Sequence, residues 1–170
     1  MIRNLTTNDL KEFCRVRLNS LNKYPVAYSS MAQTFINASD DIKMAMLKDS
    51  ESESSNFIKG YFKGDTLIGL IGLKRETRES VAHKGTMWGF YIEPEYQEKG
   101  YGKLLVQELF NEVKDDESLK YVRLQVADSC EKAIRLFKSA GFCQYGLEPE
   151  SITDGTTFYD QIYMKINCEQ

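Results

Sequence analysis

The segment WGFYIEPEYQEKGYGKLLVQELF, Trp88 to Phe110, places two glycines between a run typical of a strand and a run typical of a helix. The first turn of a helix carries backbone N–H groups without intrahelical partners, and with them a partial positive charge. Gly100 and Gly102 would let the backbone curl so that these donors converge, because glycine accepts positive φ and admits close approach. Lys99 and Lys103 add positive charge. The segment therefore predicts an anion site, and a diphosphate suits it better than a single carboxylate.

Two familiar phosphate-binding motifs are excluded by the residues themselves. The dinucleotide fingerprint G-x-G-x-x-G needs a third glycine where Leu105 stands. A Walker loop needs serine or threonine after its Gly-Lys pair, where this chain has Leu104, and it needs an earlier glycine that is missing. A strand-to-helix turn without any ligand remains the alternative interpretation of the glycine segment.

Runs with apolar residues at helical spacing alternate along the chain with apolar runs typical of strands. The predicted strands lie at 2–5, 56–62, 66–73, 86–93 and 121–126, with a last pair around an Asp154-Gly155 turn. The predicted helices run from the cap candidates Thr7 and Asn8 towards Pro25, around 40–47, and at 102–114 and 129–140. The segments 24–35 and 48–55 are expected to be loops.

The helix at 129–140 carries the clearest end signals in the chain. Asp128 with Glu131 can form a capping box, and Gly141 suits the left-handed position that follows a helix. With 170 residues and 42% hydrophobic content, we expect one domain spanning 1–170 with a full core. The order of elements predicts an α+β fold, in which helices flank both faces of a mixed, largely antiparallel sheet.

Charge and cysteine usage exclude several classes of function. The chain has 22 Lys and Arg against 25 Asp and Glu, a net charge of -3, so we expect no nucleic-acid partner. The four cysteines are far apart and predict neither a disulfide framework nor a metal site. The N-terminus lacks the apolar core of a signal peptide, and the apolar run at 66–73 is far shorter than the ~20 residues of a membrane span. We expect a cytoplasmic protein with no membrane partner.

Two motifs resemble one known family. Gln97-x-x-Gly100-x-Gly102 matches the Q/R-x-x-G-x-G/A motif of the GNAT superfamily of acyl-CoA-dependent N-acetyltransferases. About thirty residues later, AIRLFKSAGF at 133–142 resembles the second signature of that family, A-x-x-L-Y-x-x-x-G-F. The motifs cover 86–142, and the order of elements extends the likeness to nearly the whole chain. Two signatures in the right order are more specific than either alone.

The resemblance implies the GNAT-like fold, with central strands that splay apart, and acetyl-CoA (coenzyme A) as the cofactor. It implies that the coenzyme pyrophosphate is bound by the turn of Gln97, Glu98, Lys99, Gly100, Tyr101, Gly102 and Lys103. It implies that the pantetheine arm lies along Phe90, Tyr91 and Ile92, and that the helix carrying Cys130 and Phe137 lies at the thioester end. A homodimer is common in the family, although nothing in the sequence indicates one.

Acetyl transfer needs a neutral amine, a donor to the oxyanion and a proton for the departing thiolate. Many relatives supply that proton from a tyrosine at the position of Phe137, and ribosomal-protein acetyltransferases use a glutamate where this chain has Gln125. We therefore keep three hypotheses. The chain acetylates a primary amine, of a small molecule or a protein N-terminus, by direct attack in a ternary complex, or it is a non-catalytic acyl-CoA-binding sensor or interaction module. The third is a helix-start site for some other phosphate ligand. Candidate replacements for the catalytic groups are Glu93, Tyr91, Tyr145 and Tyr159.

The remaining candidates each have a structural alternative. Tyr24, Tyr28 and Phe35 fall in the segment that lines the acceptor pocket in relatives, and they could equally be core aromatics. Cys130 is expected to pack or to contact the cofactor rather than act as a nucleophile. His83, the single histidine, is expected to hydrogen-bond at a turn or strand end.

Overall fold

The computed structural model describes residues 1–28, 31–51 and 56–168. Within these ranges seven strands form one sheet in the order β1-β2-β3-β4-β5-β7-β6. Neighbouring strands pair antiparallel except β4 and β5, which pair parallel. The strands are β1 (Ile2–Asn4), β2 (Phe57–Lys63), β3 (Thr66–Arg75), β4 (Lys84–Ile92), β5 (Tyr121–Ala127), β6 (Cys143–Thr153) and β7 (Phe158–Asn167). The expected mixed, mostly antiparallel α+β sheet is confirmed.

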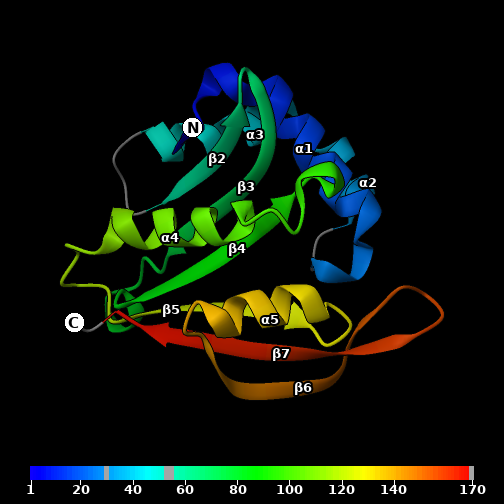
Figure 1. The fold of residues 1–170 in the computed structure, drawn as a ribbon, viewed down its shortest axis with the longest axis vertical. Helices are drawn as coiled ribbons and strands as arrows, with labels where there is room; N and C mark the ends of the chain where they lie inside the picture. The colour runs from blue at the N-terminus through cyan, green and yellow to red at the C-terminus, as the bar shows by residue number, and fades with distance from the viewer. Residues whose placement is uncertain (29–30, 52–55, 169–170) are drawn as a thin grey trace.

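Helices cover both faces of this sheet (Figure 1). The helices are α1 (Leu10–Lys23), α2 (Ala32–Asn37), α3 (Asp40–Glu51), α4 (Tyr101–Val113) and α5 (Glu131–Ser139). Apolar side chains of α1 and α3 pack on β2 and β3 in one cluster, whereas α4 and α5 pack on β2 to β5 in the other. Among the described residues, no helix is both long and apolar enough to cross a membrane.

The two central strands separate after a short contact. β4 and β5 pair only at Lys84↔Tyr121, Gly85↔Val122 and Thr86↔Arg123. β5 then pairs with β7 over its whole length, while β4 follows β3 through an irregularity at Gly89, where φ is +66°. Glycine permits this positive φ without strain. Among the described residues, the C-terminal half of β4 therefore has one backbone edge without a neighbouring strand, as the splayed arrangement requires.

Three expectations about local structure were wrong. A helix, α2, lies in the segment expected to be an aromatic loop, because Phe35 packs edge-on against Phe13 of α1, with ring centroids 6.1 Å apart. The first half of the loop expected at 48–55 is helical instead, since α3 continues to Glu51. Residues 52–55 lie outside the described ranges. The capping box of α5 does not form: Cys130 is the N-cap, and the Asp128 N–H donates to the Asp160 carbonyl of β7 instead.

The C-terminal end of α5 agrees with the prediction. Gly141 has φ of +98°. The Gly141 N–H donates to the Lys138 carbonyl and the Phe142 N–H donates to the Phe137 carbonyl, each over 3.0 Å. These two bonds form the Schellman arrangement, which satisfies carbonyls at the helix end and returns the chain towards β6.

Candidate active site

A cavity of about 730 Å³ lies where β4 and β5 diverge. Its volume falls in the range of ~300–1,000 Å³ that is usual for small-molecule sites. One wall is the end of α1 with the turn that follows, the second is the end of β4, and the third is the starts of α4 and α5. The lining residues are 23–28, 90–92, 97, 98, 100, 102, 103, 129–133, 135 and 136. The strand separation thus opens a space between segments that are distant in sequence.

The start of α4 presents free backbone donors to this cavity. Gly100 is the N-cap with φ of +84°, and the first helical bond runs from the Leu104 N–H to the Gly100 carbonyl over 3.2 Å. The N–H groups of residues 101–103 therefore point out of the helix end. A Cβ on Gly102 would lie 3.0 Å from the Phe90 ring and 3.1 Å from Leu136. Glycine at this position keeps the cavity open beside the donors, as an anion site for a diphosphate requires.

Charged side chains surround these donors. Lys103, Lys132 and Arg135 line the cavity. Lys132 pairs with Glu98 over 2.6 Å, and Arg135 pairs with Glu131 over 3.2 Å. Lys132 and Glu98 are about two-thirds exposed, so water and salt weaken their attraction. A phosphate could therefore take Lys132 from Glu98 at little free-energy cost.

Two residues of the predicted turn face away from the cavity. The Lys99 ammonium donates to the Glu95 carbonyl over 2.6 Å. The Tyr101 ring packs against Tyr61, with centroids 4.9 Å apart, and against Tyr96. Both side chains support the turn, while only the backbone N–H of Tyr101 is turned towards the expected anion.

The free edge of β4 is already hydrogen-bonded at two carbonyls. Phe90, Tyr91 and Ile92 line the cavity, as expected from the resemblance. The Ile92 carbonyl accepts from the Gln97 amide over 2.9 Å, and the Phe90 carbonyl accepts from the Tyr28 hydroxyl over 2.8 Å. The Tyr28 and Gln97 side chains thus satisfy backbone carbonyls of β4 that a neighbouring strand would satisfy if β5 continued alongside.

The first residues of α5 contribute Cys130 to the lining but not Phe137. Burial raises the pKa of the Cys130 thiol, so the start of the helix does not make it a thiolate. Phe137 is 4% exposed and lies behind Phe90, with ring centroids 5.3 Å apart. Phe137 therefore brings no hydroxyl to the cavity, where a tyrosine at this position of α5 would bring one.

The predicted acceptor aromatics divide between two places. Tyr24 and Tyr28 line the cavity, and the Tyr24 ring meets Tyr91 edge-on at 6.1 Å. Phe35 packs against Phe13 in the core between α1, α3 and the sheet. The alternative role of core aromatic therefore applies to Phe35.

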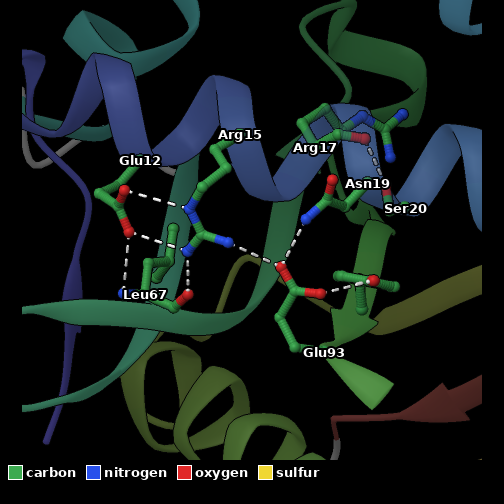
Figure 2. A network of polar contacts seen from close by, with 8 residues as sticks. Glu12, Arg15, Arg17, Asn19, Ser20, Leu67 and Glu93 are labelled. Atoms are coloured by element: carbon green, nitrogen blue, oxygen red, sulfur yellow. Dashed lines mark hydrogen bonds and ion pairs between the residues drawn. The ribbon is translucent and has the colours of Figure 1, made fainter. Parts of the chain in front are cut away.

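Glu93 anchors α1 to the end of β4 (Figure 2). Its side chain is 8% exposed, with Oε1 accepting from Arg15 and Asn19 and Oε2 accepting from the Tyr91 hydroxyl, each over 2.9 Å. Burial and the bond to Glu93 raise the pKa of Tyr91 well above its ordinary value, so its hydroxyl stays protonated. The cavity lining includes Tyr91 but not Glu93. Glu93 is thus placed to orient Tyr91.

Three other candidates lie away from the cavity. Tyr145 is 49% exposed on β6, with its ring 6.1 Å from that of Tyr163. The Tyr159 hydroxyl donates to Asp154 over 2.9 Å at the tip of the β6–β7 hairpin. His83 lies at the start of β4, where its ring meets Tyr121 edge-on at 5.8 Å. In the described ranges, no group of three or more His, Cys, Asp and Glu side chains could hold a metal ion.

Arg17 is a buried charged residue that the motif reasoning missed. It is 7% exposed, and its guanidinium carbon lies 4.6 Å from the Tyr28 ring centroid and 5.8 Å from that of Trp88. Its Nη1 has no hydrogen-bond partner among the described residues. The signal in the sequence is an arginine on the apolar side of α1, next to Val16 and one turn from Leu21.

Comparisons with known proteins agree with this geometry. The model of the acetyltransferase (GNAT) family matches residues 24–142, more than half of the chain. No curated protein sequence matches the chain.

Solved structures share the fold at low sequence identity. A GNAT-family acetyltransferase from Streptococcus pneumoniae is 20% identical, with a TM-score of 0.87 and 98% of each chain covered. A phosphinothricin acetyltransferase from Sinorhizobium meliloti, solved with acetyl-CoA, is 16% identical, with a TM-score of 0.84 and coverage of 98% and 87%. A ribosomal-protein-alanine N-acetyltransferase from Brucella melitensis is 14% identical, with a TM-score of 0.83 and coverage of 98% and 99%. The chain belongs to the GNAT family of acetyltransferases, enzymes that use acetyl-CoA.

Proposed function

We propose that the protein transfers acetyl from acetyl-CoA to a primary amine by direct attack within a ternary complex. The observation that carries this proposal is a cavity whose lining joins the start of α4 at one end to Tyr24, Tyr28 and Tyr91 at the other. When bound, acetyl-CoA supplies an activated thioester carbon. A cavity with two ends lets donor and acceptor approach from different sides, so no covalent acetyl-enzyme is required.

The chain offers a group for each part of the coenzyme. The N–H groups of residues 101–103 would bind the diphosphate, with Lys103 and Lys132 beside it. The edge of β4 at residues 90–92 would bind the amides of the pantetheine arm. This assignment is supported by the positions of Gly100 and Gly102, where a larger residue would strain the turn or narrow the cavity.

The acceptor is an amine whose class the aromatic wall restricts only in part. Solved relatives include an enzyme for phosphinothricin and one for a ribosomal-protein alanine, so both small molecules and protein N-termini are served by this fold. Rings of Tyr24 and Tyr91 would favour an alkyl ammonium before it loses its proton. We propose that Glu93 positions Tyr91, and that the ammonium proton leaves through water, because three hydrogen bonds already occupy the Glu93 oxygens.

The alternative function is a non-catalytic acyl-CoA sensor. Phe137 supports it, because its buried ring brings no hydroxyl to the cavity from α5. The two functions differ in turnover rather than in binding, so a binding measurement alone does not separate them.

Calorimetric titration with acetyl-CoA, followed by a thiol-release assay over a panel of amines, tests the proposal. We expect saturable one-to-one binding that ADP displaces weakly, and release of free thiol with at least one amine. Binding without thiol release across the panel would favour the sensor.

A pair of glycine variants tests the cavity itself. Gly102→Val should weaken acetyl-CoA binding by about ten-fold or more, because its Cβ would already meet Phe90 and Leu136. Gly146→Val on β6 is the matched control, since a Cβ there makes ordinary contact with Tyr163, remote from the cavity. Equal affinity in both folded variants would contradict the assignment.

A further inference from the structure

We propose that the Tyr28 hydroxyl donates the proton that the departing thiolate of coenzyme A receives, and that Arg17 stabilises the tyrosinate left behind. The inference rests on the proposed acetyl transfer. It assigns to the turn after α1 a task for which α5 has Phe137 in place of a tyrosine.

Tyr28 places its hydroxyl in the gap between the separated strands. The residue directly follows the 3₁₀ turn Pro25–Ala27 and lines the cavity. Its hydroxyl donates to the Phe90 carbonyl over 2.8 Å, on the free edge of β4. Cys130, the N-cap of α5, lines the same cavity. The hydroxyl therefore lies between β4 and α5, where the thioester end of the pantetheine arm is proposed to lie.

Arg17 supplies a buried cation that forms no ion pair with a carboxylate among the residues that the structure describes. An unpaired buried charge is unfavourable, and proteins normally avoid it. Figure 2 shows the Arg17 guanidinium extending away from Glu93, which is paired with Arg15 instead. The guanidinium lies over the Tyr28 ring at 4.6 Å, and its Nη1 lies 3.9 Å from where a Cβ on Gly89 would be. A tyrosinate at position 28 would be the missing partner of this charge.

The other groups around Tyr28 are consistent with this role. Burial raises the pKa of Tyr28 to about 12, while the positive charge of Arg17 acts in the opposite direction. Tyr24 and Cys130 contribute smaller increases. At neutral pH the phenol is therefore protonated, and the guanidinium that would stabilise its anion is already in place.

The proton balance of the step closes on Tyr28. The amine nitrogen bonds to the thioester carbon, and the carbon–sulfur bond breaks with its electron pair on sulfur. The phenol proton passes to sulfur and gives the free thiol. The tyrosinate then takes up the proton that the nitrogen loses as it becomes an amide, so the enzyme returns to its starting state.

Kinetics of Tyr28→Phe give the first test. We expect kcat to fall by on the order of 100-fold, while the KM of the amine changes little and acetyl-CoA binding is not weakened. Tyr163→Phe is the control, because it removes a hydroxyl that bonds Glu148 on the β6–β7 hairpin. A raised KM with kcat retained would overturn the proposal in favour of acceptor binding. Absence of thiol release by the wild-type protein would overturn both this inference and the proposed function.

A spectroscopic test measures the role of Arg17 without any turnover. With 3,5-difluorotyrosine at position 28, whose fluorines make the phenol more acidic, ¹⁹F NMR can follow phenolate formation at mild pH. Arg17→Met should raise the midpoint by about one pH unit or more, and Arg17→Lys should restore part of the difference. An unchanged midpoint in folded Arg17→Met would overturn the assignment of Arg17.

Discussion

Replacing Arg15 by methionine is expected to lower the free energy of unfolding by about 2–3 kcal/mol. Removing one partner of a buried ion pair costs ~3–5 kcal/mol, because the other charge is left without compensation. Glu93 fits that case with 8% of its side chain exposed, but Arg15 is 39% exposed, so water would partly replace the guanidinium. Asn19 and Tyr91 would keep their bonds to the carboxylate. Because Arg15 is partly exposed and Glu93 keeps two hydrogen bonds, the expected loss in the free energy of unfolding is smaller than for a fully buried ion pair.

A double-mutant cycle separates the pair from its surroundings. Glu93→Gln alone should cost about 1 kcal/mol, since Arg15 keeps Glu12 and the Leu67 carbonyl. The double variant should lose about 1–2 kcal/mol less than the sum of the single variants, because the two residues are in contact. Arg135→Met is the matched control: its ion pair is exposed on α5, and its loss should stay within about 0.5 kcal/mol.

Urea unfolding followed by circular dichroism gives these free energies, provided that the slope with urea is unchanged. Additive losses, or an Arg15→Met protein as stable as wild type, would refute the view that Arg15 holds the Glu93 carboxylate. The same variants test the chemistry. If Glu93→Gln unfolds as the wild type does but loses ~100-fold in kcat, Glu93 is a general base and does not merely orient Tyr91.

Three further changes test separate parts of the structure. Gly100→Ala should cost about 1–2 kcal/mol in stability, measured by urea unfolding, because φ is +84° there; a loss below about 0.3 kcal/mol would contradict this geometry. Asp9→Asn should destabilise by about 1 kcal/mol at pH 7, because a hydrogen bond from Arg3 lowers the Asp9 pKa. A lowered carboxyl pKa stabilises above the unfolded value of ~3.9, so the wild-type advantage should shrink as pH falls below about 4, and a constant difference from pH 7 to 2 would argue against it. Phe137→Tyr should retain thiol release, and its free energy of unfolding should fall by about 1–2 kcal/mol because a hydroxyl is packed near Phe90. A variant that binds coenzyme but is inactive would contradict the view that the residue at position 137 takes no part in proton transfer.

Local signals in the sequence were sufficient to predict the starts and ends of α4 and α5, which form one wall of the cavity. The glycines at 100 and 102 fix a turn and a helix start through their own backbone freedom and small size, so they could be recognised without knowledge of distant residues. The same holds for Gly141, which ends α5 with a positive φ. The periodic apolar stripe of α4 also specifies a helix before any partner is known.

Features that depend on residues far apart in the sequence could not be predicted in this way. α2 is held against α1 by the contact of Phe35 with Phe13. The capping box of α5 does not form because the Asp128 N–H donates to a carbonyl of β7. The Arg15–Glu93 pair joins residues 78 positions apart, so the sequence around either residue gives no sign of the other. The position of Arg17 on an apolar helix face can be recognised in the sequence. Its contacts with the Tyr28 and Trp88 rings cannot, because they depend on the folded structure.

The separation of β4 from β5 sets the conditions under which a ligand can enter. Past Thr86 one edge of β4 has no strand beside it, and buried backbone groups need partners. Tyr28 donates a hydrogen bond to the Phe90 carbonyl, and Gln97 donates one to the Ile92 carbonyl. An amide of the pantetheine arm that binds either carbonyl must therefore share it with these donors or displace them. Displacing one neutral hydrogen bond costs about 1 kcal/mol net. Tyr28→Phe removes that competition, and it should therefore bind acetyl-CoA as tightly as the wild type or a few-fold tighter even as kcat falls. Weaker binding would mean that the hydroxyl holds the coenzyme in place, which is incompatible with its assignment as a proton donor alone.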